Sequence, residues 1–149
     1  MNIQTKYVGQ VEVNEEEIIN FMNGLPGFSE ETRFTILDLP GNAVFQILQS
    51  TNTPSLAFVI TNPYHFYREY TFEIDTNTKE SLVIESEKDI AVFSIVTLQD
   101  PFEDSTMNLK APIIINPTSK RGKQFILNQE DYSTKMAIAP INSSAVRGE

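Results

Sequence analysis

The fold is decided by the stretch Ile90-Ala91-Val92-Phe93-Ser94-Ile95-Val96-Thr97-Leu98. β-Branched and aromatic residues run through it, and such side chains suit the pleated, half-buried surface of a β-sheet. The stretch is far too short to cross a bilayer as a helix, which takes roughly 20 apolar residues. We therefore expect a β-strand here and no association of the chain with a membrane.

Shorter runs of the same kind lie on both sides of this stretch. The expected strands cover residues 3–8, 10–13, 34–37, 44–48, 56–61, 90–98, 113–115 and 124–127. Turn-forming pairs such as Asn62-Pro63 and Asn116-Pro117 separate them. Many short strands with such spacing indicate a sandwich or a barrel, whereas a parallel sheet would need repeated helical crossovers that the sequence lacks. The predicted fold class is all-β, with antiparallel strands and one or two short helices.

Helical signal is confined to two places. Residues 76–87 can hold one short helix that turns Leu82 inward. Residues 14–19 fit either a helix start, with Asn14 as the cap and Glu17 three residues on, or a strand, and we favour the strand.

The length of 149 residues fits one domain, and no linker or repeat divides it. We expect a single compact domain over residues 1–139 and a flexible C-terminal tail over residues 140–149. The first residues lack the basic and apolar segments of a signal peptide. The absence of cysteine excludes disulfides, thiolate metal sites and cysteine nucleophiles.

The net charge of −9 is distributed unevenly. Residues 1–109 carry 17 acidic and 5 basic side chains, whereas residues 110–149 carry 3 acidic and 6 basic ones. A surface this negative repels phosphate, which argues against direct nucleic-acid binding by the main body. It would speed encounter with a basic partner, although acidic charge can also serve solubility alone.

Catalytic patterns are weak. His65 is the only histidine, and no Gly-x-Ser-x-Gly segment is present to expose a nucleophilic serine. One histidine without cysteine is too little for a zinc site, and no calcium-binding loop pattern occurs. Paired carboxylates keep a small acidic hydrolase open as an alternative. We expect no catalytic residue, no metal and no cofactor.

Two charged clusters, at residues 100–104 and 120–123, suggest contacts with partners or a turn more than catalysis. Within residues 100–104, Phe102 is an apolar side chain among Asp100, Glu103 and Asp104, a composition that suits docking to a basic, partly apolar surface. The basic cluster at residues 120–123 is expected at a hairpin tip. A nucleic-acid-binding five-stranded barrel, the other alternative, would instead need a basic groove with exposed aromatics.

Four segments resemble the FliW family of flagellar assembly factors. Phe21-Met22-Asn23-Gly24-Leu25-Pro26-Gly27-Phe28 is similar to that family's Phe-x-x-Gly-(Ile/Leu)-Pro-Gly-Phe signature, which we read as a rigid turn with Phe28 packed inward. The other matching segments are residues 58–63, residues 89–97 and residues 108–116, the last containing Asn-Leu-Lys-Ala-Pro. The resemblance covers about residues 1–135.

The resemblance implies a cytoplasmic protein with a compact β-barrel-like fold and no catalytic activity. It implies two protein partners: CsrA, a small basic RNA-binding homodimer that represses translation of flagellin mRNA, and flagellin itself. Flagellin that accumulates would take the FliW protein away from CsrA, and the action on CsrA would be non-competitive (allosteric), beside the RNA site. We expect the free protein to be a monomer.

Aromatic side chains beside acids are our basis for a partner surface. The predicted contact residues are Tyr67, Tyr70, Phe102, Glu103, Asp104 and Asn108. A negative body beside an RNA site would also raise the cost of bringing in phosphate, within a Debye length of roughly 8 Å. This hypothesis predicts that neutralising Glu103, Asp104 and Glu85 changes CsrA affinity and its salt dependence.

Overall fold

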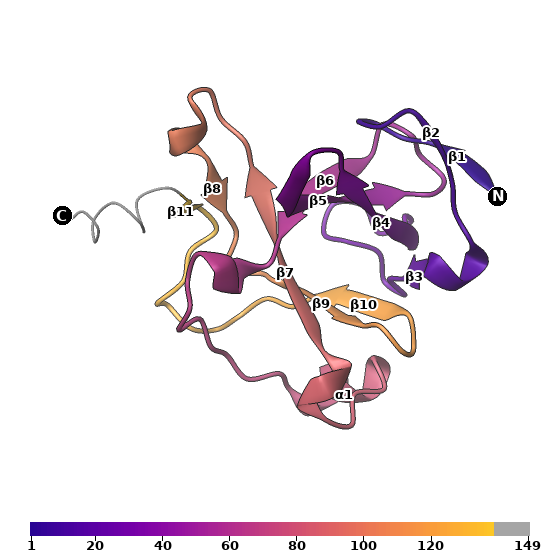
Figure 1. Cartoon of the computed structure of the whole chain (residues 1–149). Helices are drawn as coiled ribbons and strands as arrows, with labels where there is room; N and C mark the ends of the chain where they lie inside the picture. Colours follow the sequence, from indigo (N-terminus) through magenta and orange to yellow (C-terminus); the bar gives the residue numbers. More distant parts are fainter. Residues whose placement is uncertain (139–149) are drawn as a thin grey trace.

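Strand β7 (Ala91–Thr97) runs through the middle of the molecule (Figure 1). Its side chains pack into hydrophobic clusters on both faces. Phe93 and Ile95 pack against one hydrophobic cluster, whereas Val92 and Val96 belong to another. Successive side chains of a strand point to opposite faces, so apolar residues are needed at odd and even positions alike. This is why β7 has apolar residues at successive positions, apart from the buried Ser94 and the exposed Thr97 at its end, and lacks an alternation of polar and apolar residues.

The computed structural model describes residues 1–138 of the chain. Its strands are β1 (Asn2–Gln4), β2 (Gln10–Glu12), β3 (Ile19–Asn20), β4 (Arg33–Leu39), β5 (Asn42–Ser50), β6 (Ala57–Thr61), β7, β8 (Thr106–Met107), β9 (Ile113–Asn116), β10 (Arg121–Gln124) and β11 (Met136–Ala137). The expected tail over residues 140–149 lies outside the described residues.

The strands close into a barrel-like ring. The order β7-β6-β5-β4-β3-β10-β9 returns to its start because β9 also pairs with β7. Each neighbouring pair is antiparallel except β3 and β10, which are parallel through the pair Asn20 and Arg121. Strands β8 and β11 extend the sheet beyond β7, and β1 and β2 form a separate hairpin. The predicted all-β, barrel-like fold class is confirmed.

Helical turns are short and lie between strands. They are η1 (Glu15–Glu17), η2 (Pro63–His65), α1 (Thr76–Ser81), η3 (Glu87–Asp89) and η4 (Phe102–Asp104). The expected helix at 76–87 ends at Ser81, and Leu82 is buried as predicted, with 3% exposed. Among residues 1–138, no helix has the length and apolar character needed to span a bilayer.

The preference for a strand over residues 14–19 is wrong for most of that segment. The Asn14 N–H donates to the Glu17 carboxylate at 3.0 Å, and the Glu17 N–H donates to the Asn14 carbonyl at 2.8 Å. This local pairing starts a 3₁₀ turn before the chain can extend. The strand begins only at Ile19.

The strand expected at 124–127 is displaced towards the N-terminus. Strand β10 begins at Arg121 and ends at Gln124, and it pairs with β9 in the hairpin predicted from the basic cluster. The turn itself covers residues 117–120, so Arg121 and Lys123 lie on the returning strand and not at the tip. Beyond β10 the chain stays extended, but it pairs with no strand along residues 125–128.

The signature turn at 21–28 joins β3 to β4 and buries a different residue from the one expected. Leu25 is 3% exposed, whereas Phe28 is 41% exposed, so the inward placement of Phe28 is wrong. Leu25 and Phe28 exchange backbone hydrogen bonds of 3.3 and 2.7 Å across the turn. The tight bridge turns the Leu25 side chain into the core and leaves the Phe28 ring outside, against Phe58.

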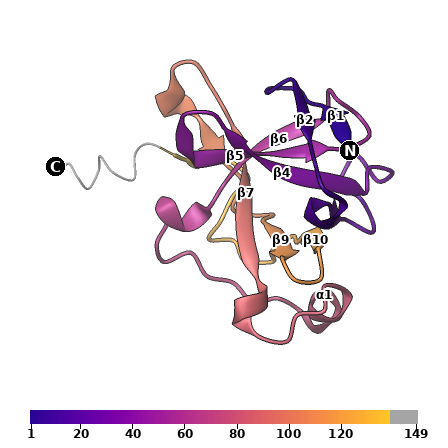
Figure 2. The ribbon, with the colours of Figure 1, turned by 45° about the vertical axis from the view of Figure 1, so that its right-hand side comes forward.

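Hydrophobic side chains form two main clusters, one on each side of β6 and β7. The first contains Ile19, Phe21, Leu25, Phe34, Leu48, Ile60, Ile113 and Ile115. The second contains Phe45, Val59, Tyr70, Val96, Met107, Leu109, Leu127 and Ile138. Viewed from two directions, α1 lies at one end of β7, and the β8 strand with η4 lies at the other end (Figures 1 and 2).

Candidate interaction surface

Phe102 is an exposed aromatic residue on a turn that is held firmly in place. The turn η4 follows β7, and the Asp104 N–H donates to the Pro101 carbonyl at 3.0 Å. The buried Ser105 hydroxyl accepts the Gln99 N–H at 2.8 Å, which ties the turn to the end of β7. Phe102 remains 46% exposed. A turn whose backbone is fixed in this way loses little conformational entropy when it binds a partner.

Two further aromatic rings extend from Phe102 towards the core. The Phe45 ring of β5 meets the Phe102 ring edge-on, with centroids 5.9 Å apart. Phe45 in turn stacks on Phe66, with centroids 6.3 Å apart. Sequence reasoning missed Phe45 and Phe66 as members of this surface, because a strand pattern does not say which residue will lie under a distant turn.

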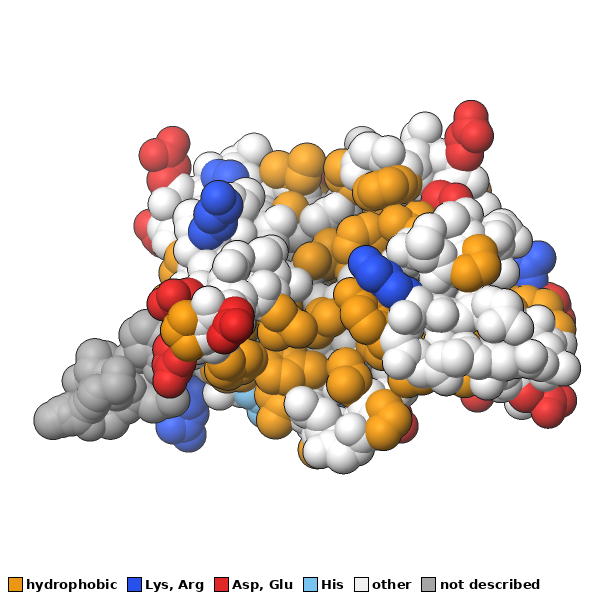
Figure 3. All heavy atoms as spheres, turned by 90° about the horizontal axis from the view of Figure 1, so that it is seen from above, with side chains coloured by type: hydrophobic (Ala, Val, Ile, Leu, Met, Phe, Trp, Pro, Cys, Tyr) orange, Lys and Arg blue, Asp and Glu red, His pale blue; other side chains and the backbone are white. Residues whose placement is uncertain are grey.

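Acidic side chains surround Phe102. Asp100, Glu103 and Asp104 are all exposed. Within residues 1–138 the only ion pair joins Arg33 to Glu15, so these three carboxylates are not neutralised by a neighbouring base. Figure 3 shows acidic side chains gathered around a hydrophobic one over the η4 end of the molecule, beside a band of hydrophobic surface that crosses this face. An apolar anchor ringed by unpaired negative charge can dock a basic, partly apolar surface.

The other three predicted contact residues are more deeply built into the fold. Tyr70 is 3% exposed, and its hydroxyl donates to the Leu109 carbonyl at 2.7 Å. Tyr67 is half-buried and its hydroxyl donates to the Ala137 carbonyl at 2.5 Å. The Asn108 side chain accepts the Ala111 N–H at 2.9 Å.

These contacts separate the predicted set into two groups. Phe102, Glu103 and Asp104 share one exposed turn, whereas Tyr67 and Asn108 are half-buried and Tyr70 is buried. The hydroxyls of Tyr67 and Tyr70 and the side-chain oxygen of Asn108 are all hydrogen-bonded within the fold. We therefore take the three η4 residues as the centre of the candidate surface, and the contacts expected of Tyr67, Tyr70 and Asn108 stay predictions.

The acidic cluster at 85–89 lies far from this turn. Its residues precede β7, whereas η4 follows β7, and a seven-residue strand spans roughly 20 Å. Glu85 therefore does not join Glu103 and Asp104 in one patch. The two clusters form separate negative regions at opposite ends of β7 (Figure 1).

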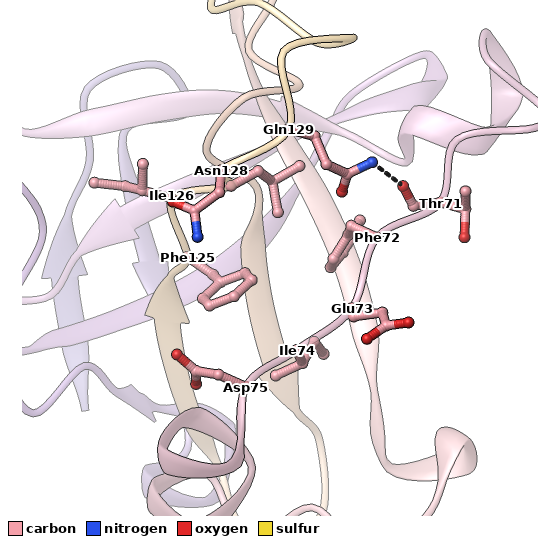
Figure 4. Close-up of a pocket in the computed structure, with 10 residues that line it drawn as sticks. Thr71, Phe72, Glu73, Ile74, Asp75, Phe125, Ile126, Asn128 and Gln129 are labelled. Atoms are coloured by element: carbon pink, nitrogen blue, oxygen red, sulfur yellow. Dashed lines mark hydrogen bonds between the residues drawn. The ribbon is translucent and has the colours of Figure 1, made fainter.

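A large open slot of about 740 Å³ lies between residues 71–75 and 125–129 (Figure 4). It contains two carboxylates, those of Glu73 and Asp75, and is thus the place to look for hydrolase chemistry. The Asp75 carboxylate accepts the Thr78 N–H at 2.8 Å as the cap of α1. Hydrogen bonds from Thr78 lower the pKa of Asp75, the opposite of what a general acid requires.

A metal site needs several ligand side chains close together. Residues 1–138 contain no cluster of three or more His, Cys, Asp or Glu side chains arranged to hold a metal ion. His65, the only histidine of the sequence, is exposed on η2.

Comparisons with known proteins agree with this architecture. A family model described as "FliW protein" matches residues 2–138. The flagellar assembly factor FliW of Oceanobacillus iheyensis is 50% identical over 138 residues, covering 93% of this chain and 94% of that protein. The corresponding protein of Bacillus subtilis is 44% identical, covering 93% and 96%. A crystal structure of the flagellar assembly factor FliW superposes with a TM-score of 0.89 at 45% identity, covering 93% of this chain and 96% of that one.

The fold and the similarity to known proteins together define a β-barrel-like protein of flagellar assembly. More particularly, this chain belongs to the FliW family, as the four sequence segments predicted.

Proposed function

We propose that this protein acts by binding two other proteins, CsrA and flagellin, and that it has no catalytic activity. Binding to CsrA relieves the repression of flagellin mRNA translation, and accumulated flagellin reverses the relief by taking the protein away. The observation that supports this proposal is the exposed Phe102 on a pinned turn among unpaired carboxylates. The exchange takes place in the cytoplasm, with this protein a monomer when free.

The action on CsrA is non-competitive. The negative surface of the η4 turn lies beside bound CsrA's RNA site and does not fill it, and it raises the free energy of bringing phosphate nearby. Charges act over a Debye length of roughly 8 Å at physiological ionic strength. The three carboxylates of Asp100, Glu103 and Asp104 are exposed and have no basic partner among residues 1–138, so their field is not cancelled locally.

The test uses two matched pairs of neutral substitutions. Glu103→Gln with Asp104→Asn removes two charges from the η4 turn, and Glu85→Gln with Glu87→Gln removes two charges at the other end of β7. Affinity for purified CsrA is measured at several salt concentrations by calorimetry. We expect the η4 pair to weaken binding about tenfold and flatten its salt dependence, with little change for the other pair. Equal behaviour of the two pairs would contradict the proposed surface.

A second measurement examines the mechanism. RNA binding to CsrA is titrated at increasing concentrations of this protein, and then flagellin is added. A non-competitive action lowers the amount of RNA bound even at saturating RNA, and flagellin restores it. Full recovery of RNA binding by excess RNA alone would show competition for the same site.

A further inference from the structure

Residues 71–75 and 125–129 run as two extended segments on either side of the open slot (Figure 4). Neither segment belongs to a strand. The first leads directly into α1 through its cap Asp75, so the slot lies at the α1 end of the molecule, away from η4. This site is therefore separate from the surface of the proposed function and does not depend on it.

The segment at 125–129 has one paired edge and one free edge. The Phe125 and Leu127 N–H groups donate to the carbonyls of Pro112 and Lys110 at 2.9 and 2.8 Å. The N–H groups of Ile126 and Asn128 make no hydrogen bond within residues 1–138. Alternate N–H groups of an extended chain point to opposite sides, so the free pair faces away from the barrel. Such an edge is a template for another strand.

The segment on the opposite side of the slot, residues 71–75, also has unpaired backbone N–H groups. Within the described part of the chain, the N–H groups of Phe72, Glu73 and Ile74 also make no hydrogen bond. The Gln129 side chain donates to the Thr71 carbonyl at 3.5 Å and joins the two segments at one end. The two sides thus meet at one end and offer unpaired backbone along their length.

The walls of the slot define the chemistry that it would accept. The rings of Phe72 and Phe125 lie 6.4 Å apart between the segments, and they provide an apolar floor together with the buried Leu127. Glu73 and Asp75 supply negative charge, and none of the residues that line the slot is basic. The Glu73 carboxylate has no hydrogen-bond or ion-pair partner within residues 1–138, whereas that of Asp75 is engaged at the start of α1.

We propose that the slot binds an extended peptide segment of a partner protein by strand addition to the free edge of residues 125–129. The main chain of the peptide pairs with the Ile126 and Asn128 N–H groups. An apolar side chain of the peptide contacts Phe72 and Phe125, and a Lys or Arg side chain pairs with Glu73. Five extended residues span roughly 17 Å, the length of an ordinary strand, so the edge can hold one short peptide strand.

The experiment titrates the ¹⁵N-labelled protein with a panel of heptapeptides that alternate lysine with valine, isoleucine, leucine or phenylalanine. We expect at least one peptide to shift the Ile126 and Asn128 amide signals and to slow their hydrogen exchange at least tenfold. Phe125 and Leu127, whose amides are already bonded, should show much smaller changes in exchange. The same peptide with alternate backbone nitrogens methylated should not bind, because it cannot form the ladder.

Charge reversal supplies the second arm of the test. Glu73→Lys should weaken peptide binding at least tenfold, and Glu16→Lys, an equal change on the exposed η1 turn, should leave it unchanged. The proposal is overturned if no peptide of the panel protects the two amides or if the signals that shift are those of the η4 turn. It is also overturned if the edge proves to be protected by self-association of the protein at the same concentration.

Discussion

The Phe102 ring meets the Phe45 ring edge-on, with centroids 5.9 Å apart, although Phe102 itself is 46% exposed. One edge of the ring is therefore anchored in the fold, and the other is presented to solvent among acids. An exposed aromatic residue that is held in this way has the properties of a binding hot spot.

Replacing Phe102 with Ala should separate binding from stability. We expect the free energy of unfolding to fall by only about 1 kcal/mol, because the ring is half-exposed. Affinity for CsrA should fall about 30-fold, the loss typical of a hot-spot residue. Urea unfolding and calorimetry measure the two effects. Met22→Ala is the control, since Met22 is 65% exposed and lies on a different turn. Comparable loss of affinity in that variant would contradict a specific role of Phe102.

Phe21 and Phe28, at the two ends of the signature turn, should respond very differently to truncation. Phe21 is fully buried and packs edge-on against Phe34, so Phe21→Ala should cost about 3–5 kcal/mol of unfolding free energy. Phe28 is 41% exposed and touches Phe58, so Phe28→Ala should cost only about 1 kcal/mol. Chemical unfolding of both variants checks this. Similar costs would mean that Phe28 is buried in solution.

Gly24 is required by both its conformation and its surroundings. It has a φ of +67°, and a Cβ there would contact the backbone of Ser29 at 2.7 Å. Gly9 has a similar φ of +71° but open space around it. Gly9→Ala should therefore cost about 1–2 kcal/mol for the left-handed conformation. Gly24→Ala should cost a further 1–3 kcal/mol or so for the clash. Thermal unfolding ranks the two variants, and equal costs would show that the turn relaxes.

Glu31 should make the free energy of unfolding depend on pH in the acidic range. The hydroxyls of Thr53 and Ser50 donate to its carboxylate at 2.5 and 2.7 Å, and these bonds lower its pKa. A lowered pKa means that the stabilisation is present above the unfolded value of about 4.5 and is lost as the pH falls through the folded value. Glu31→Gln should destabilise the protein at pH near 7, and its deficit should shrink at pH near 3.

Urea unfolding at the two pH values measures this deficit. Glu30→Gln, at the exposed neighbouring position, is the control and should show little deficit at either pH. A deficit of Glu31→Gln that is independent of pH would exclude a role for the charge.

Tyr70 should limit stability in alkali. Burial is the main cause that raises the pKa of Tyr70, and the nearby Tyr64 and Tyr132 raise it further. The folded protein therefore keeps the phenol neutral, whereas the unfolded chain ionises near pH 10, so stability is lost as the pH rises above about 10. Tyr70→Phe should remove that loss, at a cost of about 1–3 kcal/mol near neutral pH for the unpaired Leu109 carbonyl. Unfolding curves near neutral pH and above a pH of about 10 test the variant. Tyr7→Phe, at an exposed position, is its control.

Strand positions were the part of the fold most accessible from the sequence. Runs of β-branched and aromatic residues located β5, β6, β7 and β9, because burial of a strand dictates its composition directly. The two-residue strands β8 and β11 were not predicted. They exist because distant segments meet, as when Met136 pairs with Met107 and the Ile138 N–H bonds to Ser105. Nothing in their own sequence distinguishes them from loops.

The candidate surface shows the same division. The composition of residues 100–104 identified an apolar residue among acids, and the structure places these residues on one exposed turn. The aromatic run that includes Tyr67 and Tyr70 carries no local sign of which ring is exposed. Tyr70 is covered because Tyr132, 62 residues later, packs edge-on against it at 4.7 Å.

The sequence by itself determined the β class, the turns, the negative charge and the family to which this chain belongs, since each is expressed in residues that lie next to one another. Only the tertiary structure decided the closure of the ring through β9 and β7, the outward position of Phe28 and the burial of Tyr70. It also decided the free edge beside residues 125–129, where Leu127 bonds to Lys110 and Ile126 is left unpaired within residues 1–138. The physical reason is that the local sequence pattern indicates whether a residue tends to be buried. The side chains that bury it come from distant parts of the chain, which a local pattern does not identify.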